Sequence, residues 1–420
     1  MPETPQAAPS PAATPAPNSW RAVAAAMFAC GWGGNQFTPL LLMYRRLGGY
    51  STLSVDAFLG AYVVGLVPGL LLAGPVSDRR GRRPVLVAGA VASAVASLVL
   101  CFGGQSAWPI YAGRLITGFA VGIAMAVGSS WVKELSAGAD GGLAARRAAL
   151  CQTAGFGLGA GVAGVLAQWG PWPMVTPYVV HLLLAVVIPV LLLRVPETRP
   201  PLPHVTGSVR ELLTALVNDL RVPAPARRRF RLVVLPMAPW VFGTAGLAYA
   251  VMPQLVGFRV GDWGLAYATG LTVLTLGTGV AVQPVARRLH RERGTRTGRA
   301  PVAAMAVTLV GAALCAVNAV LLSPWLAAVA SAALGAGYGI AVVSGLLEIQ
   351  RMAGADDLAG LTGVYYTLAY AGFLLPTVLA TLSAWLSYPV MLAAVAAVAL
   401  VCLGLVMTGA RVTEPAAPAR

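Results

Sequence analysis

Charged side chains are scarce in this sequence. Only 10% of its 420 residues are Asp, Glu, Lys or Arg, whereas 58% are hydrophobic. An average water-soluble domain carries about 25% charged residues. The composition therefore excludes an ordinary globular protein and predicts a chain surrounded by lipid.

Residues that build metal sites, disulfides and hydrolytic centres are also few. The chain has three histidines and five cysteines, and no two cysteines have CxxC spacing. We therefore predict buried, unpaired thiols and no bound metal or other cofactor. The HExxH and G-x-S-x-G patterns are absent, so nothing in the sequence supports an enzyme. The only lysine, Lys133, follows Val132 instead of glycine, which excludes a phosphate-binding loop and an ATP-driven pump.

Long apolar runs are abundant. They are about 20 residues long, enough for a helix to cross the ~30 Å hydrocarbon layer. In lipid the backbone must satisfy its own hydrogen bonds, so we expect helices rather than strands. The predicted fold class is an all-α membrane protein with twelve transmembrane helices in two six-helix halves. The predicted spans are 23–44, 57–76, 84–102, 108–132, 148–169, 177–193, 232–256, 264–286, 301–321, 325–349, 358–385 and 389–407.

Basic residues test this arrangement. The formal net charge is +15, and an N-terminus in the cytoplasm places 25 of the 29 Lys and Arg residues on the cytoplasmic side, as the positive-inside rule requires. Both termini are then cytoplasmic. Because the arginines lie between apolar runs and not on one soluble surface, we predict no nucleic-acid partner. The preference for arginine over lysine is typical of a GC-rich bacterial genome, so we expect a multi-pass protein in the lipid bilayer of a bacterial inner (plasma) membrane.

The longest connection between spans divides the chain. Its apolar positions from 209 to 220 have helical spacing, which predicts an amphipathic helix on the cytoplasmic face. A flexible, solvated linker is the alternative. The predicted parts are a disordered cytoplasmic tail (1–19), a first six-helix half (20–194), this linker (195–231), a second six-helix half (232–410) and a cytoplasmic tail (411–420).

The loop between the second and third spans carries the most specific motif. From Gly74 to Leu86 the chain reads GPVSDRRGRRPVL. Glycine at 81 suits a tight turn between antiparallel helices, and glycine at 74 suits a close helix contact. Asp78 lies where the membrane ends, so its charge needs a nearby arginine or a helix N-terminus.

This segment resembles the signature loop of the major facilitator superfamily, G-x-L-A-D-R-x-G-R-R-x-x-L. The resemblance implies that family's fold and a gating role, in which the aspartate helps to lock the two halves together on the cytoplasmic side. A purely topological role for the arginines is the alternative interpretation. The candidate gating residues are Gly74, Asp78, Arg79, Gly81, Arg82 and Arg83.

Two glycine patterns predict close helix packing. Arg114-x-x-x-Gly118-x-x-x-Gly122 in the fourth span resembles a second motif of the family. Gly155 and Gly159 belong to a glycine-rich fifth span similar to that of drug/proton antiporters, although their Gly-Pro pair is absent. Small residues at these positions let helix backbones approach. Together the resemblances point to bacterial drug or metabolite efflux members.

Arg114 is the only arginine predicted to lie within the hydrocarbon. An unpaired charge there costs about 2.5 kcal/mol or more, so such residues are candidates for binding or coupling. The alternative is a side chain that reaches outward to lipid headgroups or to Asp56.

In the family, spans one, four, seven and ten line the central cavity. Asn35 and Gln36 are candidates there because amides in lipid need partners, although a hydrogen bond between helices would also satisfy them. His181 is a candidate for coupling because histidine titrates near neutral pH, and a packed, hydrogen-bonded histidine is the alternative. The substrate or coupling candidates are Asn35, Gln36, Arg114, Trp240, Tyr249, Tyr338 and His181.

An apolar, aromatic cavity suits a moderately hydrophobic solute. We therefore predict a secondary active transporter that works as a monomer and moves a small organic, hydrophobic or drug-like molecule by alternating access. Export coupled to protons is the predicted direction, and uptake of a metabolite by a symporter or facilitator is the alternative. A receptor that uses the same fold without transport is the alternative of another class.

Overall fold

The computed structural model describes residues 18–136, 141–199, 222–291, 298–353 and 358–411. Every regular element within these ranges is a helix. The predicted amphipathic linker helix lies outside the described residues, as do 1–17 of the N-terminal tail and 412–420 of the C-terminal tail. We call residues 18–199 the first half and residues 222–411 the second half.

Each half is a series of helices, some of which are interrupted by short 3-10 or π-helical turns. The first half contains α1 (Trp20–Asn35), η1 (Thr38–Leu40), α2 (Leu41–Arg46), α3 (Thr52–Arg80), α4 (Arg82–Leu100), α5 (Ala107–Ile123), η2 (Ala124–Gly128), α6 (Ser129–Leu135), α7 (Gly141–Trp169) and α8 (Thr176–Leu193). The second half contains η3 (Ala224–Ala226), α10 (Arg227–Arg229), η4 (Phe230–Val234), α11 (Leu235–Gly246), η5 (Leu247–Val251), α12 (Met252–Val256), η6 (Gly257–Trp263), α13 (Gly264–Ala281), α14 (Gln283–Arg291), α15 (Arg299–Leu321), α16 (Pro324–Met352), α17 (Leu358–Ala371), η7 (Gly372–Leu374), α18 (Leu375–Leu382) and α19 (Tyr388–Ala410).

Ten helical segments of the described chain are long and apolar enough to cross a membrane. One of them, Ala224–Leu289, is 66 residues long. It contains Gly261, whose φ of 54° and ψ of −128° interrupt the helical path between α12 and α13. The N-terminal elements α1 and α2 are each short because a 3-10 turn at Thr38–Leu40 separates them. The structure is therefore that of an all-helical membrane protein.

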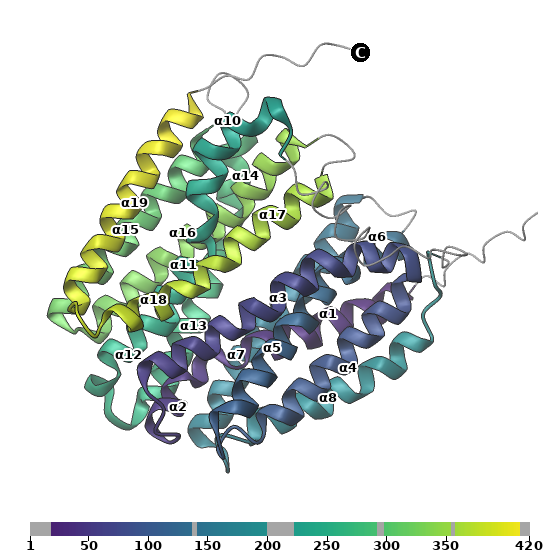
Figure 1. Ribbon diagram of the computed structural model, residues 1–420, viewed down its shortest axis with the longest axis horizontal. Helices are drawn as coiled ribbons and strands as arrows, with labels where there is room; N and C mark the ends of the chain where they lie inside the picture. The colour runs from purple at the N-terminus through teal and green to yellow at the C-terminus, as the bar shows by residue number, and fades with distance from the viewer. Residues whose placement is uncertain (1–17, 137–140, 200–221, 292–297, 354–357, 412–420) are drawn as a thin grey trace, which may run out of the picture.

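The two halves form two bundles that meet at one end (Figure 1). They lie together where α2, α12 and α13 begin or end, and they separate toward α6, α14 and α17. We call the end that holds α10 and the turn between α3 and α4 the basic end, and the end that holds α2 and η6 the opposite end.

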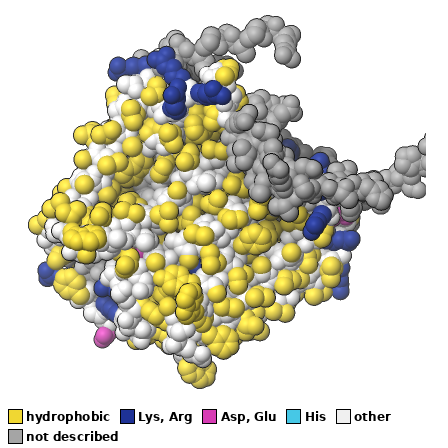
Figure 2. Space-filling view, in the orientation of Figure 1, with side chains coloured by type: hydrophobic (Ala, Val, Ile, Leu, Met, Phe, Trp, Pro, Cys, Tyr) yellow, Lys and Arg dark blue, Asp and Glu magenta, His cyan; other side chains and the backbone are white. Residues whose placement is uncertain are grey.

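Hydrophobic side chains cover most of the visible face, and basic side chains lie toward its edges (Figure 2). That distribution suits a surface in contact with lipid.

Glycines bring paired helices close together within each half. In the first half, a Cβ added to Gly118 of α5 would lie 2.0 Å from the carbonyl oxygen of Tyr62 in α3. In the second half, a Cβ on Gly339 of α16 would lie 2.0 Å from the carbonyl oxygen of Gly279 in α13. Close packing of the two backbones stabilises such helix pairs, because the hydrophobic effect between helices is weak in lipid.

The same device joins the two halves. Gly164 of α7 has no room for a side chain because Thr269 of α13 occupies the space. On the other side of the interface, Gly60 of α3 faces Leu374 and Thr377 of the second half. The contacts of α7 with α13, and of α3 with η7 and α18, therefore form a large part of the seam between the bundles.

We expect Gly118→Ala to destabilise the protein and Gly270→Ala to leave its stability unchanged or slightly raised. The new Cβ at 118 would meet backbone at 2.0 Å, and overpacking of this kind costs about 1–3 kcal/mol. A Cβ at Gly270 meets nothing within 4 Å, so the higher helix propensity of alanine is unopposed there. Thermal unfolding in detergent measures both variants, and equal midpoints would contradict the tight contact.

Candidate functional site

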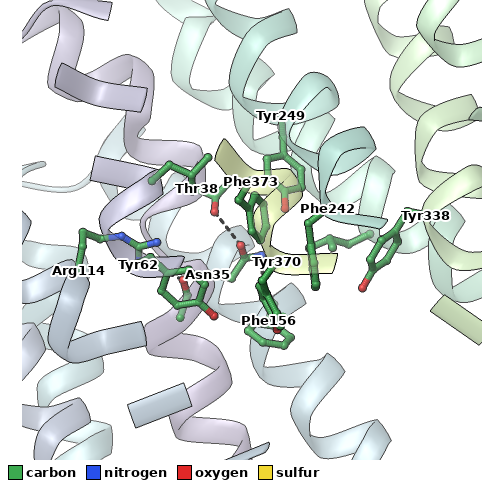
Figure 3. Close-up of a pocket in the computed structure, with 13 residues that line it drawn as sticks. Asn35, Thr38, Tyr62, Arg114, Phe156, Phe242, Tyr249, Tyr338, Tyr370 and Phe373 are labelled. Carbon is green, nitrogen blue, oxygen red and sulfur yellow. Dashed lines mark hydrogen bonds between the residues drawn. The ribbon is translucent and has the colours of Figure 1, made fainter. Parts of the chain in front are cut away.

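A cavity lies between the two halves (Figure 3). Both halves contribute to its lining. The lining residues are Gly34, Asn35, Thr38, Leu59, Tyr62, Arg114 and Phe156 from the first half, and Phe242, Tyr249, Leu276, Tyr338, Tyr370 and Phe373 from the second. Its free volume is about 30 Å³, enough for about two water molecules. A larger solute fits only when the walls move apart.

Arg114 supplies the charge of this cavity. Its side chain extends from α5, and the residue is 1% exposed. The guanidinium carbon lies 4.6 Å from the ring centre of Phe37 and 4.5 Å from that of Tyr62, so two aromatic faces stabilise the cation. Nη1 donates to the carbonyl of Gly34 at 3.2 Å, and Nε approaches the carbonyl of Phe58 at 3.4 Å. The side chain thus points into the protein and does not reach outward to lipid headgroups.

Two polar side chains lie beside Arg114 at the end of α1. The hydroxyl of Thr38 donates to Oδ1 of Asn35 at 2.7 Å, and Nδ2 of Asn35 donates to the carbonyl of Phe156 at 3.0 Å. Thr38 follows Asn35 by three residues, which places both side chains on the same wall (Figure 3). These bonds hold the amide in one orientation at the cavity.

Three stacked rings form the wall of the second half. Phe242 of α11 stacks on Tyr370 of α17 with ring centres 4.1 Å apart and 21° between the ring planes. It also stacks on Phe373 of η7 at 4.7 Å and 24°. We call Phe242, Tyr370 and Phe373 the aromatic stack. It faces the wall that carries Arg114 (Figure 3).

The structure brings together four of the seven substrate or coupling candidates. Asn35, Arg114, Tyr249 and Tyr338 line the cavity, whereas Gln36, Trp240 and His181 lie elsewhere. Trp240 is in the hydrophobic core of the second half. Sequence reasoning missed Tyr62, Phe156, Phe242 and Phe373.

Phe242 was missed because the sequence does not show which face of α11 meets the cavity. It follows Trp240 by two residues, which places the two rings about 200° apart around the helix. An apolar helix with aromatic residues on both faces carries no signal of which face meets the cavity. A polar–apolar asymmetry would have been that signal, and α11 lacks it.

Gln36 and His181 belong to a separate polar network. His181 Nε2 lies 2.9 Å from the carbonyl of Ala29, so this nitrogen carries the proton and donates. Nδ1 lies 2.6 Å from the hydroxyl of Ser97, which also receives Nε2 of Gln36 at 3.2 Å. The network ties α8 to α1 and α4, away from the cavity.

The signature loop lies at the basic end. Gly81 has a φ of 97°, a conformation that favours glycine, and it ends α3 immediately before α4 begins. Asp78 Oδ1 lies 2.8 Å from Nη1 of Arg82 and 3.6 Å from Nε of Arg199. Arg82 in turn pairs with Glu134 of α6 at 2.9 Å. These partners of Asp78 and Arg82 all belong to the first half.

The two glycines of the signature loop, Gly74 and Gly81, differ in their surroundings. The carboxylate of Glu197 accepts hydrogen bonds from the backbone N–H groups of Arg82 and Arg83, both at 2.9 Å, and so caps the start of α4. A Cβ at Gly81 would lie 2.6 Å from that carboxylate. A Cβ at Gly74, by contrast, would meet nothing within 4 Å, so the helix contact expected at this glycine is not made in this conformation. Arg79 is partly buried on the last turn of α3.

The glycines predicted to pack helices lie at backbone contacts. A Cβ on Gly122 would lie 2.6 Å from the carbonyl oxygen of Leu66 in α3. In α7, a Cβ on Gly155 would lie 2.2 Å from the carbonyl oxygen of Phe28, and one on Gly159 would lie 2.6 Å from that of Trp32. The helices α3 and α5, and likewise α1 and α7, therefore touch through their backbones.

Polar contacts between the halves gather at the opposite end. Nε2 of Gln254 donates to Oδ1 of the buried Asp56 at 2.8 Å, and Oε1 of Gln254 accepts from Nη1 of Arg45 at 3.2 Å. Thr377 donates to the backbone carbonyl of Asp56 at 2.8 Å. Arg46 donates to two backbone carbonyls of η6. We call Arg45, Asp56, Gln254 and Thr377 the interhalf network.

Comparison with known proteins gives three kinds of similarity. A family model described as Major Facilitator Superfamily matches residues 21–376. A gallate transporter of Pseudomonas putida is 32% identical over 124 residues, which cover 29% of this chain and 26% of that relative. The chain thus matches about a quarter of that relative's length.

Solved structures of three transporters share the fold at low sequence identity. The peptide transporter POT in complex with sulfate has a TM-score of 0.73 and 12% identity, covering 95% of this chain and 96% of that one. The nucleoside transporter NupG has a TM-score of 0.70 and 13% identity, covering 94% and 100%. The xylose transporter XylE from E. coli, in a partially occluded inward open conformation, has a TM-score of 0.68 and 12% identity, covering 93% and 97%.

We expect Arg82→Gln to lower the unfolding temperature and the neighbouring Arg83→Gln to change it much less. Arg82 is the nearest cation to both Asp78 and Glu134, and loss of one partner from a half-buried ion pair costs about 1–3 kcal/mol. The guanidinium of Arg83 makes a long contact of 3.4 Å with the carbonyl of Leu193. Thermal unfolding in detergent compares them. Equal shifts would show that the charge of the loop matters, and not the particular contacts of Arg82.

Proposed function

Because this chain belongs to the Major Facilitator Superfamily and is a membrane transporter rather than an enzyme, we propose that it carries a small organic solute across the bacterial inner membrane by alternating access. The two halves rock about the cavity, which opens first to one side and then to the other. The observation that carries this proposal is the cavity itself, since its lining comes from both halves. A monomer is sufficient because one chain supplies both walls.

We propose twelve spans with both termini in the cytoplasm. The count follows if α1, η1 and α2 cross the membrane together and if the path from Ala224 to Leu289 turns back at Gly261. Most of the basic residues then lie on the cytoplasmic side, as the positive-inside rule requires. The opposite end, with its interhalf network, would face outward, and this conformation would be closed to the outside.

The aromatic lining supports a solute with a substantial apolar surface. Export of such a hydrophobic or drug-like molecule is the direction we propose. Uptake of a metabolite is the second candidate, and the partial similarity to a gallate transporter favours it. In either direction, Asp78 and the arginines around it would pair across the halves when the basic end closes.

Asp56 is the strongest candidate for proton coupling. Glu134 and Glu348 each have an arginine partner at 2.9 Å or less, and both ring nitrogens of His181 are hydrogen-bonded. Asp56 instead is buried between the halves and accepts from the neutral amide of Gln254. The nearby ionisable groups are Arg45 of α2 and Tyr388 of α19. Protonation there would weaken the interhalf network and favour its opening.

Purified protein in proteoliposomes should move at least one compound from a panel of hydrophobic antibiotics, dyes and small metabolites. Movement should saturate and should accelerate under an imposed pH gradient, with protein-free liposomes as the control. If the rate of solute movement does not depend on the pH gradient, proton coupling is contradicted and the protein is a facilitator. If no compound moves, transport is contradicted and the receptor alternative gains support.

Asp56→Asn should abolish the acceleration by a pH gradient while solute exchange in the absence of a gradient continues. Asparagine can still accept a hydrogen bond from Gln254, so the substitution removes the titratable group and little else. Thr377→Val is the matched control because it removes a hydrogen bond to the backbone of Asp56 and no titratable group. An Asp56→Asn protein that still responds to pH would place coupling elsewhere.

A further inference from the structure

Arg114 gives the cavity a net positive charge. Of the thirteen residues that line the cavity, it is the only one with a charged side chain. Among the described residues, no Asp or Glu forms an ion pair with it. The charge is 1% exposed, so water compensates for little of the cost of burial.

The groups around Arg114 leave part of the guanidinium unused. A guanidinium has five N–H groups arranged to hold a carboxylate through two parallel hydrogen bonds. The carbonyls of Gly34 and Phe58 engage Nη1 and Nε, and no described residue accepts a hydrogen bond from Nη2. Phe37 and Tyr62 cover the faces of the cation, which leaves its edge for an acceptor.

The second half has no such charge at the matching position. The backbone contacts of Gly118 with Tyr62 and of Gly335 with Thr275 relate α5 to α16. Arg114 lies four residues before Gly118, and Ser331 lies four residues before Gly335. By this register, Ser331 corresponds to Arg114. Ser331 donates to the carbonyl of Ala248 and is buried. The positive charge is therefore a property of one wall.

We propose that the solute is an aromatic monoanion whose carboxylate binds Arg114 and whose ring packs against the aromatic stack. This inference rests on the proposed function, because it names the class of solute carried at the same site. A carboxylate would supply the missing counter-charge and the missing acceptor in one group. A planar ring suits the aromatic stack, because the rings of Tyr370 and Phe373 already lie within 24° of parallel to that of Phe242.

The arrangement also explains how binding would act on both halves. The anion would be held by α5 of the first half, and the ring by α11, α17 and η7 of the second half. Such a ligand bridges the halves and favours conformations in which both walls close on it. A cation would be repelled by Arg114, and a neutral ring would leave that charge uncompensated. The small cavity of this conformation must widen before the ligand enters.

The test compares acids with their amides on wild-type protein in nanodiscs. The probes are benzoate, 3,4,5-trihydroxybenzoate and 1-naphthoate, each paired with its primary amide, and 1-naphthylmethylammonium as the cation. At least one acid should bind at least about tenfold more tightly than its amide, because a hydrogen-bonded charge pair is worth that much. Equal affinity within every pair, tighter binding of the cation, or no binding of any acid would overturn the proposal.

Variants then assign the effect to Arg114. Arg114→Gln should remove the preference for acid over amide, and Arg114→Lys should retain part of it because the charge remains. Arg147→Gln is the matched control: Arg147 also lies over an aromatic ring, that of Trp20 at 4.2 Å, but outside the cavity. An acid preference that survives in Arg114→Gln contradicts the assignment. If Arg114→Gln does not fold, the wild-type comparison decides alone.

Binding and transport separate the two proposals. One outcome is that acids bind the wild-type protein but neither they nor any compound of the panel crosses the membrane of proteoliposomes. That outcome would contradict transport and support the anion site. The reverse outcome is that neutral compounds are transported and no acid binds. It would contradict the anion site and support transport.

Discussion

The backbone contact between α3 and α5 sets the positions of the groups around the cavity. Gly118 and Gly122 lie against the carbonyls of Tyr62 and Leu66, one turn apart. Continuing the same register by one turn brings Arg114 to the carbonyl of Phe58. Because helices in lipid gain little from hydrophobic burial against each other, this approach depends on residues without side chains. The glycine contacts thus place the charged side chain of Arg114 in the interior. The ring of Tyr62, from the same helix contact, packs against the guanidinium.

Two carboxylates of the described chain are compensated by arginine side chains. Glu134 is paired with Arg82, and the fully buried Glu348 forms a two-point ion pair with Arg229 at 2.6 and 3.0 Å. These pairs lie at the basic end, where each half holds its own. Arg114 differs because its compensation comes from π faces and carbonyls. That contrast is the physical ground for treating the cavity as a receptor for an anion, since a buried charge pair is stable only when both partners are present.

The two ends of the molecule have different polar contacts. At the basic end, the signature loop, Glu134 and Glu197 are joined within the first half. At the opposite end, Gln254 connects Asp56 and Arg45 across the interface. A molecule built this way can hold the seam at its opposite end closed while the helices at the basic end diverge (Figure 1). The low-dielectric interior strengthens each of these polar contacts.

Local sequence patterns determined the fold class and the character of the signature loop. Apolar length alone indicates helices in lipid, the i, i+4 spacing of Asp78 and Arg82 already pairs them, and the spacing of Arg114, Gly118 and Gly122 already places them on one face. The family match confirms the resemblance inferred from these motifs. Such features survive folding because they depend on residues within one or two helical turns.

Only the tertiary structure decided which helix faces meet. It turned Phe242 and not Trp240 toward the cavity, sent Gln36 and His181 to a network with Ser97, and left Gly74 without a neighbour. It also made Asp56 part of an interface between residues 198 and 321 positions apart. A nearly uniform apolar helix has no polar stripe to report its rotation, so the orientation of each helix depends on the packing of its neighbours.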